Sequence, residues 1–146
     1  MPCIAAWHKP QAGGLGNKRL ELPIILVVED DQLIQGLVED TLSDGGFDIA
    51  IAASGEEAVT LLQGHSGKYC ALVTDINLKG KMDGWEVAQR AREAHPEFPI
   101  VYLSGAFAAD WTSKGVPKSV MLSKPFAPAQ LLTAVSTLLN GGAPAR

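Results

Sequence analysis

A short apolar run that ends in three acids constrains the fold of this chain more than any other stretch. The run covers residues 24–28 (IILVV), and Glu29, Asp30 and Asp31 follow it directly. A continuous run of Ile, Leu and Val is typical of a strand buried on both faces, as in a parallel sheet. Acids that follow such a strand lie where open α/β sheets bind their ligands. Because clustered carboxylates beside a core are costly alone, the run predicts that a divalent metal or a lysine joins them.

Strand-like runs alternate with segments of helical periodicity along the chain. Strands are predicted at residues 24–28, 47–52, 69–74, 99–103 and 119–122, and helices at 31–44, 54–63, 83–94, 106–114 and 128–139. Asp31, Ser54 and Asp83 have the side chains and positions of helix caps. Alternation of this kind predicts parallel βαβ units with right-handed crossovers, and therefore a three-layer α/β/α sandwich with a five-stranded parallel sheet.

The two ends of the chain differ from the middle. Residues 1–22 mix Pro and Gly with Lys and Arg without any period, so we expect a flexible N-terminal tail. Residues 23–140 form one predicted domain, and residues 141–146 a short C-terminal tail. The stretch at residues 12–19 (AGGLGNKR) is similar to a nucleotide-binding loop. It lacks the required glycines, because Asn17 precedes Lys18 and Arg19 takes the third glycine position, and it precedes a strand instead of following one.

Composition narrows the function classes. The formal net charge is −4, which gives no basis for direct binding of nucleic acid. No apolar run approaches the about 20 residues of a membrane span, and no signal-peptide core is visible. Cys3 lies in the tail and Cys70 in a predicted strand, so we expect no disulfide and a reduced, cytoplasmic setting.

Polar side chains follow four of the predicted strands. Glu29 and Asp30 follow the first, Asp75 the third, Ser104 the fourth and Lys124 the fifth. Parallel strands bring these ends to one edge of the sheet. Three carboxylates in one crevice favour a hard cation such as Mg²⁺, which is held by one or two carboxylates in phosphoryl-transfer sites.

This set of residues suggests a specific chemistry. One aspartate is expected to act as a nucleophile and to become an aspartyl phosphate. Mg²⁺, the Lys124 ammonium and the Ser104 hydroxyl can share the charge of the transferring phosphoryl group. The spacing of the acids alone leaves open which aspartate is the nucleophile.

The sequence resembles the receiver domain of bacterial two-component response regulators. The resemblance rests on ILVVEDD, VTDINL, MDGWE, YLSG and SKPF in this order, and it covers residues 23–140. It implies a flavodoxin-like sheet with strand order 2-1-3-4-5. It also implies that Asp75 is the phosphoacceptor, that Ser104 is the switch hydroxyl, and that Lys124 precedes a cis-prone proline, Pro125. The implied Mg²⁺ ligands are Asp30, Asp75 and the backbone carbonyl of Asn77, with Glu29 acting mainly through water.

The resemblance also implies partners. The phosphoryl group would come from a histidine kinase or a histidine phosphotransfer protein, and Asp75 would lose it slowly to water. The chain would then not be an enzyme beyond its own phosphorylation and autodephosphorylation. Its signal would pass to a downstream protein target through protein contacts, without nucleic acid or membrane. A homodimer through the fourth helix, fifth strand and fifth helix is a candidate assembly.

The chain departs from the family pattern in four places. The loop after Asp75 (LKGKMDG) is one residue longer and lacks the usual proline. Met121 replaces an aromatic residue that is frequent three positions before the lysine. Only 20 residues separate Ser104 from Lys124, so the fourth helix is expected to be short or irregular. Gly105 stands where Ala is common.

Three alternatives remain open at this point. The chain could be a pseudo-receiver that docks a partner without being phosphorylated, or a receiver fragment of a hybrid histidine kinase. It could also be a phosphatase that uses an aspartyl phosphate. Such phosphatases commonly need a second aspartate two residues after the nucleophile, and this position is Asn77.

Overall fold

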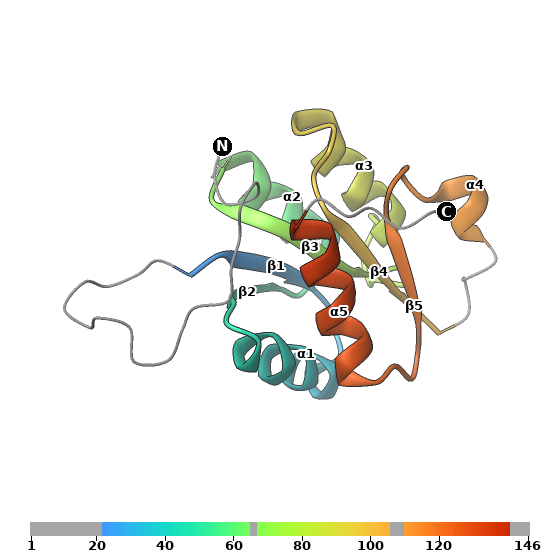
Figure 1. The fold of residues 1–146 in the computed structure, drawn as a ribbon. Helices are drawn as coiled ribbons and strands as arrows, with labels where there is room; N and C mark the ends of the chain where they lie inside the picture. The colour runs from blue at the N-terminus through green and yellow to red at the C-terminus, as the bar shows by residue number, and fades with distance from the viewer. Residues whose placement is uncertain (1–21, 65–66, 106–109, 141–146) are drawn as a thin grey trace.

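The described part of the chain is a parallel sheet between two layers of helices (Figure 1). This computed structural model describes residues 22–64, 67–105 and 110–140. The sheet has five strands in the order β2-β1-β3-β4-β5, and all four neighbouring pairs are parallel. The predicted flavodoxin-like topology is therefore confirmed. Almost all of the predicted N-terminal tail and the C-terminal residues 141–146 lie outside the described residues.

The strands and helices occur in the predicted order along the chain. The strands are β1 (Ile24–Val28), β2 (Asp48–Ala52), β3 (Tyr69–Asp75), β4 (Ile100–Ser104) and β5 (Val120–Ser123). The helices are α1 (Gln32–Asp44), α2 (Gly55–Gly64), α3 (Gly84–Ala94), α4 (Trp111–Lys114) and α5 (Pro128–Leu139).

The apolar runs at β1 and β3 occupy the centre of the sheet. All seven residues of β3 are buried, and residues 25–28 of β1 are fully buried. Side chains of β1 alternate between the two faces: Ile25 and Val27 join the core under α1 and α5, whereas Leu26 and Val28 join the core under α2 and α3. Burial on both faces explains why these strands read as continuous apolar runs and not as alternating ones.

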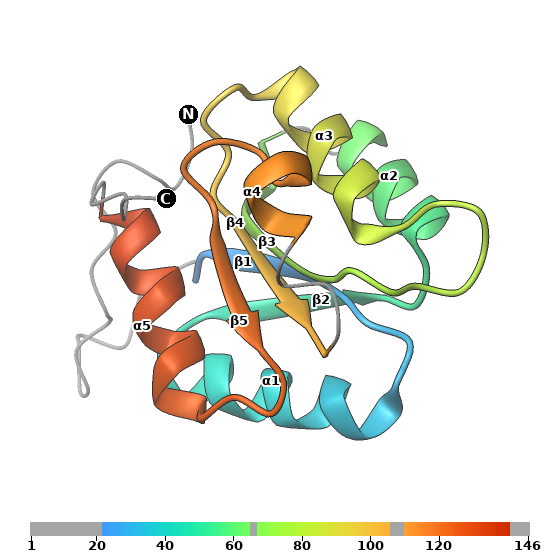
Figure 2. The ribbon, with the colours of Figure 1, turned by 90° about the vertical axis from the view of Figure 1, so that its right-hand side faces the viewer.

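The helices cover both faces of the sheet. Figure 2 shows α1 and α5 on one side of the sheet and α2, α3 and α4 on the other. The predicted caps of three helices are confirmed. Asp31 Oδ1 accepts from the N–H of Leu33 at 2.9 Å, and Asp83 Oδ1 accepts from the N–H of Glu86 at 3.0 Å. At α2, Ser54 Oγ accepts from a backbone N–H at 3.1 Å. Each cap satisfies an N–H group that the helix itself leaves unpaired.

The predicted fourth helix is described only in part. Of the predicted range 106–114, α4 covers Trp111–Lys114 with Asp110 as its N-cap residue, and residues 106–109 lie outside the described residues. Side-chain bonds hold the connection that follows α4. The Trp111 indole N–H donates to Ser119 Oγ at 2.9 Å, and Arg92 of α3 donates to the carbonyls of Phe98 and Pro117, each at 2.6 Å. The short link between Ser104 and Lys124 leaves little chain for a longer helix.

One finding bears on the expected redox setting. Cys70 is disulfide-bonded in the structure, so the prediction of no disulfide is wrong for this residue, and it cannot support a reduced setting. Cys70 is fully buried, and burial in a strand does not prevent a disulfide. Cys3, the other cysteine of the chain, lies outside the described residues. Within the described ranges no helix has the length and apolar character needed to cross a bilayer.

Candidate functional site

Three carboxylates meet at the carboxyl ends of β1 and β3. Glu29 and Asp30 directly follow β1, and Asp75 is the last residue of β3. The two strands are paired with Val28 opposite Thr74, so the residues that follow them lie side by side. One oxygen atom from each of the three carboxylates lies within 4.8 Å of the other two. The topology alone therefore brings together acids that are far apart in the sequence.

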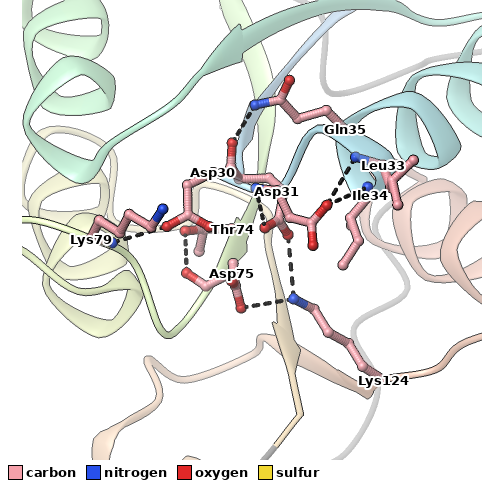
Figure 3. A network of polar contacts seen from close by, with 10 residues as sticks. Asp30, Asp31, Leu33, Ile34, Gln35, Thr74, Asp75, Lys79 and Lys124 are labelled. Carbon is pink, nitrogen blue, oxygen red and sulfur yellow. Dashed lines mark hydrogen bonds and ion pairs between the residues drawn. The ribbon is translucent and has the colours of Figure 1, made fainter.

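Lys124 brings a positive charge to this cluster from the end of β5. Its Nζ lies 3.2 Å from Asp75 Oδ1 and 3.4 Å from Glu29 Oε1, as Figure 3 shows for Asp75. The backbone N–H of Lys124 donates to the carbonyl of Ser104 at 2.8 Å, which ties the end of β5 to the end of β4. The peptide bond between Lys124 and Pro125 is cis, as the family resemblance implies.

The protein holds the acids in fixed positions through backbone and side-chain hydrogen bonds (Figure 3). Glu29 Oε2 accepts from the N–H of Asp31 at 3.1 Å, and the Glu29 carbonyl accepts from the Gln35 side-chain amide at 2.6 Å. The Thr74 hydroxyl donates to the carbonyl of Asp75 at 2.9 Å. The first bond orients the Glu29 carboxylate, and the other two hold the backbone of Glu29 and Asp75 in place.

Burial makes the charged forms of two acids unfavourable. Glu29 is fully buried and Asp75 is 6% exposed. Burial raises the pKa of Glu29 from 4.5 to about 7, and the negative charge of Asp75 adds to this rise. Burial also raises the pKa of Asp75, although the nearby Lys124 opposes the shift. A single lysine thus leaves the negative charge of three acids incompletely compensated.

The donor set suits a hard divalent cation. Glu29, Asp30 and Asp75 offer only carboxylate oxygens, which are the ligands that Mg²⁺ prefers, and a divalent charge would offset their mutual repulsion. Asp30 is partly exposed, so the cluster opens toward solvent on its side. These residues therefore fit the Mg²⁺ site that the sequence predicts.

Ser104 and Asn77 occupy the same edge of the sheet. Ser104 ends β4, which pairs with β3 so that Leu103 lies opposite Asp75, and it is 1% exposed. The backbone N–H of Asn77 forms a hydrogen bond with Asp75 that opposes the rise of the Asp75 pKa. The roles of the Ser104 hydroxyl and the Asn77 carbonyl stay predictions.

Some residues that shape the site have no obvious signal in the sequence. A Cβ added at Gly84 would overlap the carbonyl oxygen of Asp75, so α3 can begin this close to the site only with glycine. Gln35 reaches the site from α1, and the carboxylate of Glu56 contacts the loop after Asp75. Gly84 lies within the MDGWE motif, which is the only signal of its role in the sequence. Nothing in the spacing of Gln35 or Glu56 points to the site.

A cavity of about 280 Å³ lies away from the acids. It opens between α2 and α3 near the start of β3, and Leu62, Tyr69 and Phe98 are among its lining residues. It is therefore at the opposite edge of the sheet and shares no residue with the acidic cluster.

The chain is similar to known receiver domains over most of its length. A family model for the response regulator receiver domain matches residues 25–136. The crystal structure of a response regulator receiver protein from Sinorhizobium medicae is 44% identical, with a TM-score of 0.81, and the match covers 85% of this chain and 99% of that one.

Two longer proteins also match. The transcriptional regulatory protein CusR of Escherichia coli is 31% identical over 121 residues, and the sensor kinase CckA of Brucella abortus is 30% identical over 119 residues. The matches cover 82% and 80% of this chain, but only 52% of CusR and 12% of CckA. The similarity thus concerns one domain of these relatives.

Proposed function

Because the chain belongs to the response regulator receiver family, we propose that it is the phosphoacceptor of a two-component phosphorelay and that Asp75 takes the phosphoryl group. One observation carries the proposal. The carboxylate of Asp75 lies almost buried in a cluster of acids, and its Oδ1 is 3.2 Å from the ammonium of Lys124. The nucleophilic carboxylate thus contacts a cation and belongs to a potential metal site.

The surroundings favour Asp75 over Asp30 as the nucleophile. Asp75 faces Lys124, which could compensate charge on a phosphoryl group attached to it. Among the described residues, no lysine side chain forms an ion pair with Asp30, and its Oδ2 accepts from the backbone N–H of Lys79 at 3.1 Å. Asp30 is therefore better suited to hold a metal than to attack phosphorus.

The chemistry follows from these positions. A carboxylate oxygen of Asp75 attacks the phosphorus of a phosphohistidine, the P–N bond breaks, and its electron pair returns to the histidine nitrogen. Glu29, Asp30, Asp75 and the Asn77 carbonyl would hold Mg²⁺, which when bound supplies positive charge to the phosphoryl oxygens. Lys124 and the Ser104 hydroxyl take up further charge. Water later attacks phosphorus, which releases phosphate and restores the carboxylate of Asp75.

The wider role belongs to the same proposal. The donor is a histidine kinase or a histidine phosphotransfer protein, and the phosphorylated chain signals to a protein target in the cytoplasm. The family of the matched relatives, which include a transcriptional regulator and a sensor kinase, supports this class of partner. The chain does not turn over an external substrate in this scheme.

Beryllofluoride, which mimics a phosphoryl group on aspartate, tests the proposal directly. Added with Mg²⁺, it should give one bound ¹⁹F resonance set in the wild-type chain and none in Asp75→Asn. Asp83→Asn is the matched control, because Asp83 caps α3 and lies outside the acidic cluster, and it should still form the adduct. A wild-type chain that forms no adduct would leave only a docking role without phosphorylation.

A further inference from the structure

The loop after Asp75 is attached to two different acids. In this loop, residues 78–82, the N–H of Lys79 donates to Asp30 Oδ2 at 3.1 Å, and the N–H of Lys81 donates to Glu56 Oε2 at 2.9 Å. Asp30 belongs to the acidic cluster, whereas Glu56 stands in the first turn of α2. Two backbone bonds in one short turn therefore connect an acid outside the site to an acid inside it.

Gly80 makes this turn possible. It lies between the two donating residues and has φ +99°, a value that residues with a side chain rarely adopt. A Cβ at Gly80 would lie only 3.0 Å from Glu56 Oε1, so the turn passes directly against the Glu56 carboxylate. The left-handed turn at Gly80 thus brings the loop into contact with the Glu56 carboxylate.

The start of α2 is itself close to the loop. A Cβ added at Gly55 would lie 2.8 Å from the carbonyl oxygen of Met82. The Glu56 carboxylate is held in its ionised form, because hydrogen bonds from its own backbone N–H and from Lys81 lower its pKa. A charged acceptor forms stronger hydrogen bonds than a neutral one.

We propose that Glu56 is a positioning residue for the phosphoacceptor site: it holds the 78–82 loop in the turn from which the Lys79 N–H orients the carboxylate of Asp30. This inference rests on the proposed function and adds a residue that lies outside the acidic cluster. The bond from Lys79 to Oδ2 restricts the rotation of the Asp30 carboxylate, which is one of the three that would hold a cation. The loop also follows Asn77 directly, so its path sets where the Asn77 carbonyl can point.

A role in general stability does not account for these contacts. Glu56 is exposed, and the cap of α2 is made by Ser54 and Glu57: Ser54 Oγ accepts from the Glu57 N–H, and Glu57 Oε1 accepts from the N–H of Ala53 at 3.1 Å. The next residue in the sequence is therefore a matched control, since Glu57 is an acid in the same helical turn whose carboxylate binds Ala53 and not the loop.

Isothermal titration calorimetry of the full chain with Mg²⁺ tests the inference. Glu56→Ala should weaken Mg²⁺ binding on the order of tenfold, as removal of a residue that orients a metal ligand does. Glu56→Gln keeps an acceptor oxygen and should recover most of the affinity. Glu57→Ala should lower the melting temperature through loss of the cap but change the Mg²⁺ affinity less than about twofold.

Amide hydrogen exchange without metal gives a second readout. The amides of both Lys81 and Lys79 should exchange faster in Glu56→Ala, and neither should in Glu57→Ala. Unchanged Mg²⁺ affinity in Glu56→Ala, or an equal loss in Glu57→Ala, would overturn the inference. Absence of Mg²⁺ binding in the wild-type chain would instead contradict the proposed function, so the two failures can be told apart.

Discussion

At the scale of single residues, Lys124 is the side chain that compensates negative charge at the site. It contacts both Asp75 and Glu29, and it lowers the pKa of each. We predict that Lys124→Gln slows phosphorylation of Asp75 by a small-molecule donor such as phosphoramidate by about tenfold or more, because a preorganised cation is lost. Intact-mass spectrometry of the phosphorylated chain over time measures the rate.

Lys79→Gln is the control for this change. Lys79 is exposed, and it binds Asp30 through its backbone N–H, which the substitution keeps. Its rate should stay within about twofold of the wild-type rate. Equal slowing in both variants would mean that the general positive charge near the site matters, and not the position of Lys124.

Residues differ in how far the sequence reveals them. Glu29, Asp30, Asp75 and Lys124 could be foreseen as neighbours, because each stands at the end of a predicted strand and parallel strands end at one edge. Glu56 could not be foreseen. Its partner is a backbone N–H in a loop whose path depends on the positive φ of Gly80, and neither the loop path nor a backbone partner leaves a spacing pattern in the sequence.

At the scale of elements, the approach of α3 to β3 depends on Gly84. The N–H of Gly84 donates to the carbonyl of Ile76 at 2.9 Å, and a Cβ there would overlap the Asp75 carbonyl oxygen. We predict that Gly84→Ala destabilises the fold by about 1–3 kcal/mol, because the start of α3 must move away. Urea unfolding followed by circular dichroism measures the change.

Gly36→Ala is expected to have the opposite sign. Gly36 lies inside α1, and a Cβ there meets nothing within 4 Å. The substitution should stabilise the fold by about 0.5–1 kcal/mol, because alanine loses less backbone entropy in a helix than glycine. Destabilisation of similar size by both substitutions would show that the crowding at Gly84 is not the cause.

The accuracy of the predicted elements depends on how each is stabilised. The strands were placed within about a residue, since burial on both faces produces continuous apolar runs that are visible in the sequence. The helix predicted at 106–114 is confirmed at Trp111–Lys114, while residues 106–109 lie outside the described residues. Trp111 and Arg92 hold this region through side-chain bonds to other segments, and such contacts leave no periodic pattern in the sequence.

At the scale of the whole molecule, burial of the acidic cluster removes part of the stability that the two hydrophobic cores supply. Glu29 is fully buried, yet it extends the apolar strand β1, so folding must remove its carboxylate from water. The cost is tolerated because apolar layers under α1 and α5 and under α2 and α3 enclose the strands on both faces. Global stability should therefore report on the protonation of the site.

The pH dependence of unfolding follows from the raised pKa of Glu29. Between pH 4.5 and about 7 the folded chain keeps a proton on Glu29 that the unfolded chain has released, so the free energy of unfolding falls as the pH rises. In metal-free buffer the loss should be on the order of 2–3 kcal/mol by pH 8. The raised pKa of Asp75 acts in the same direction.

Glu29→Gln should flatten this curve and stabilise the metal-free chain at pH 8, because the amide carries no charge to be buried. Urea unfolding at pH 5 and pH 8 in the presence of EDTA measures both effects. Glu39→Gln changes an exposed acid of α1 and should leave the wild-type slope in place. If the wild-type chain were instead more stable at pH 8 than at pH 5, burial would not dominate the titration of Glu29. The ion pair with Lys124 would then be the stronger influence on its carboxylate.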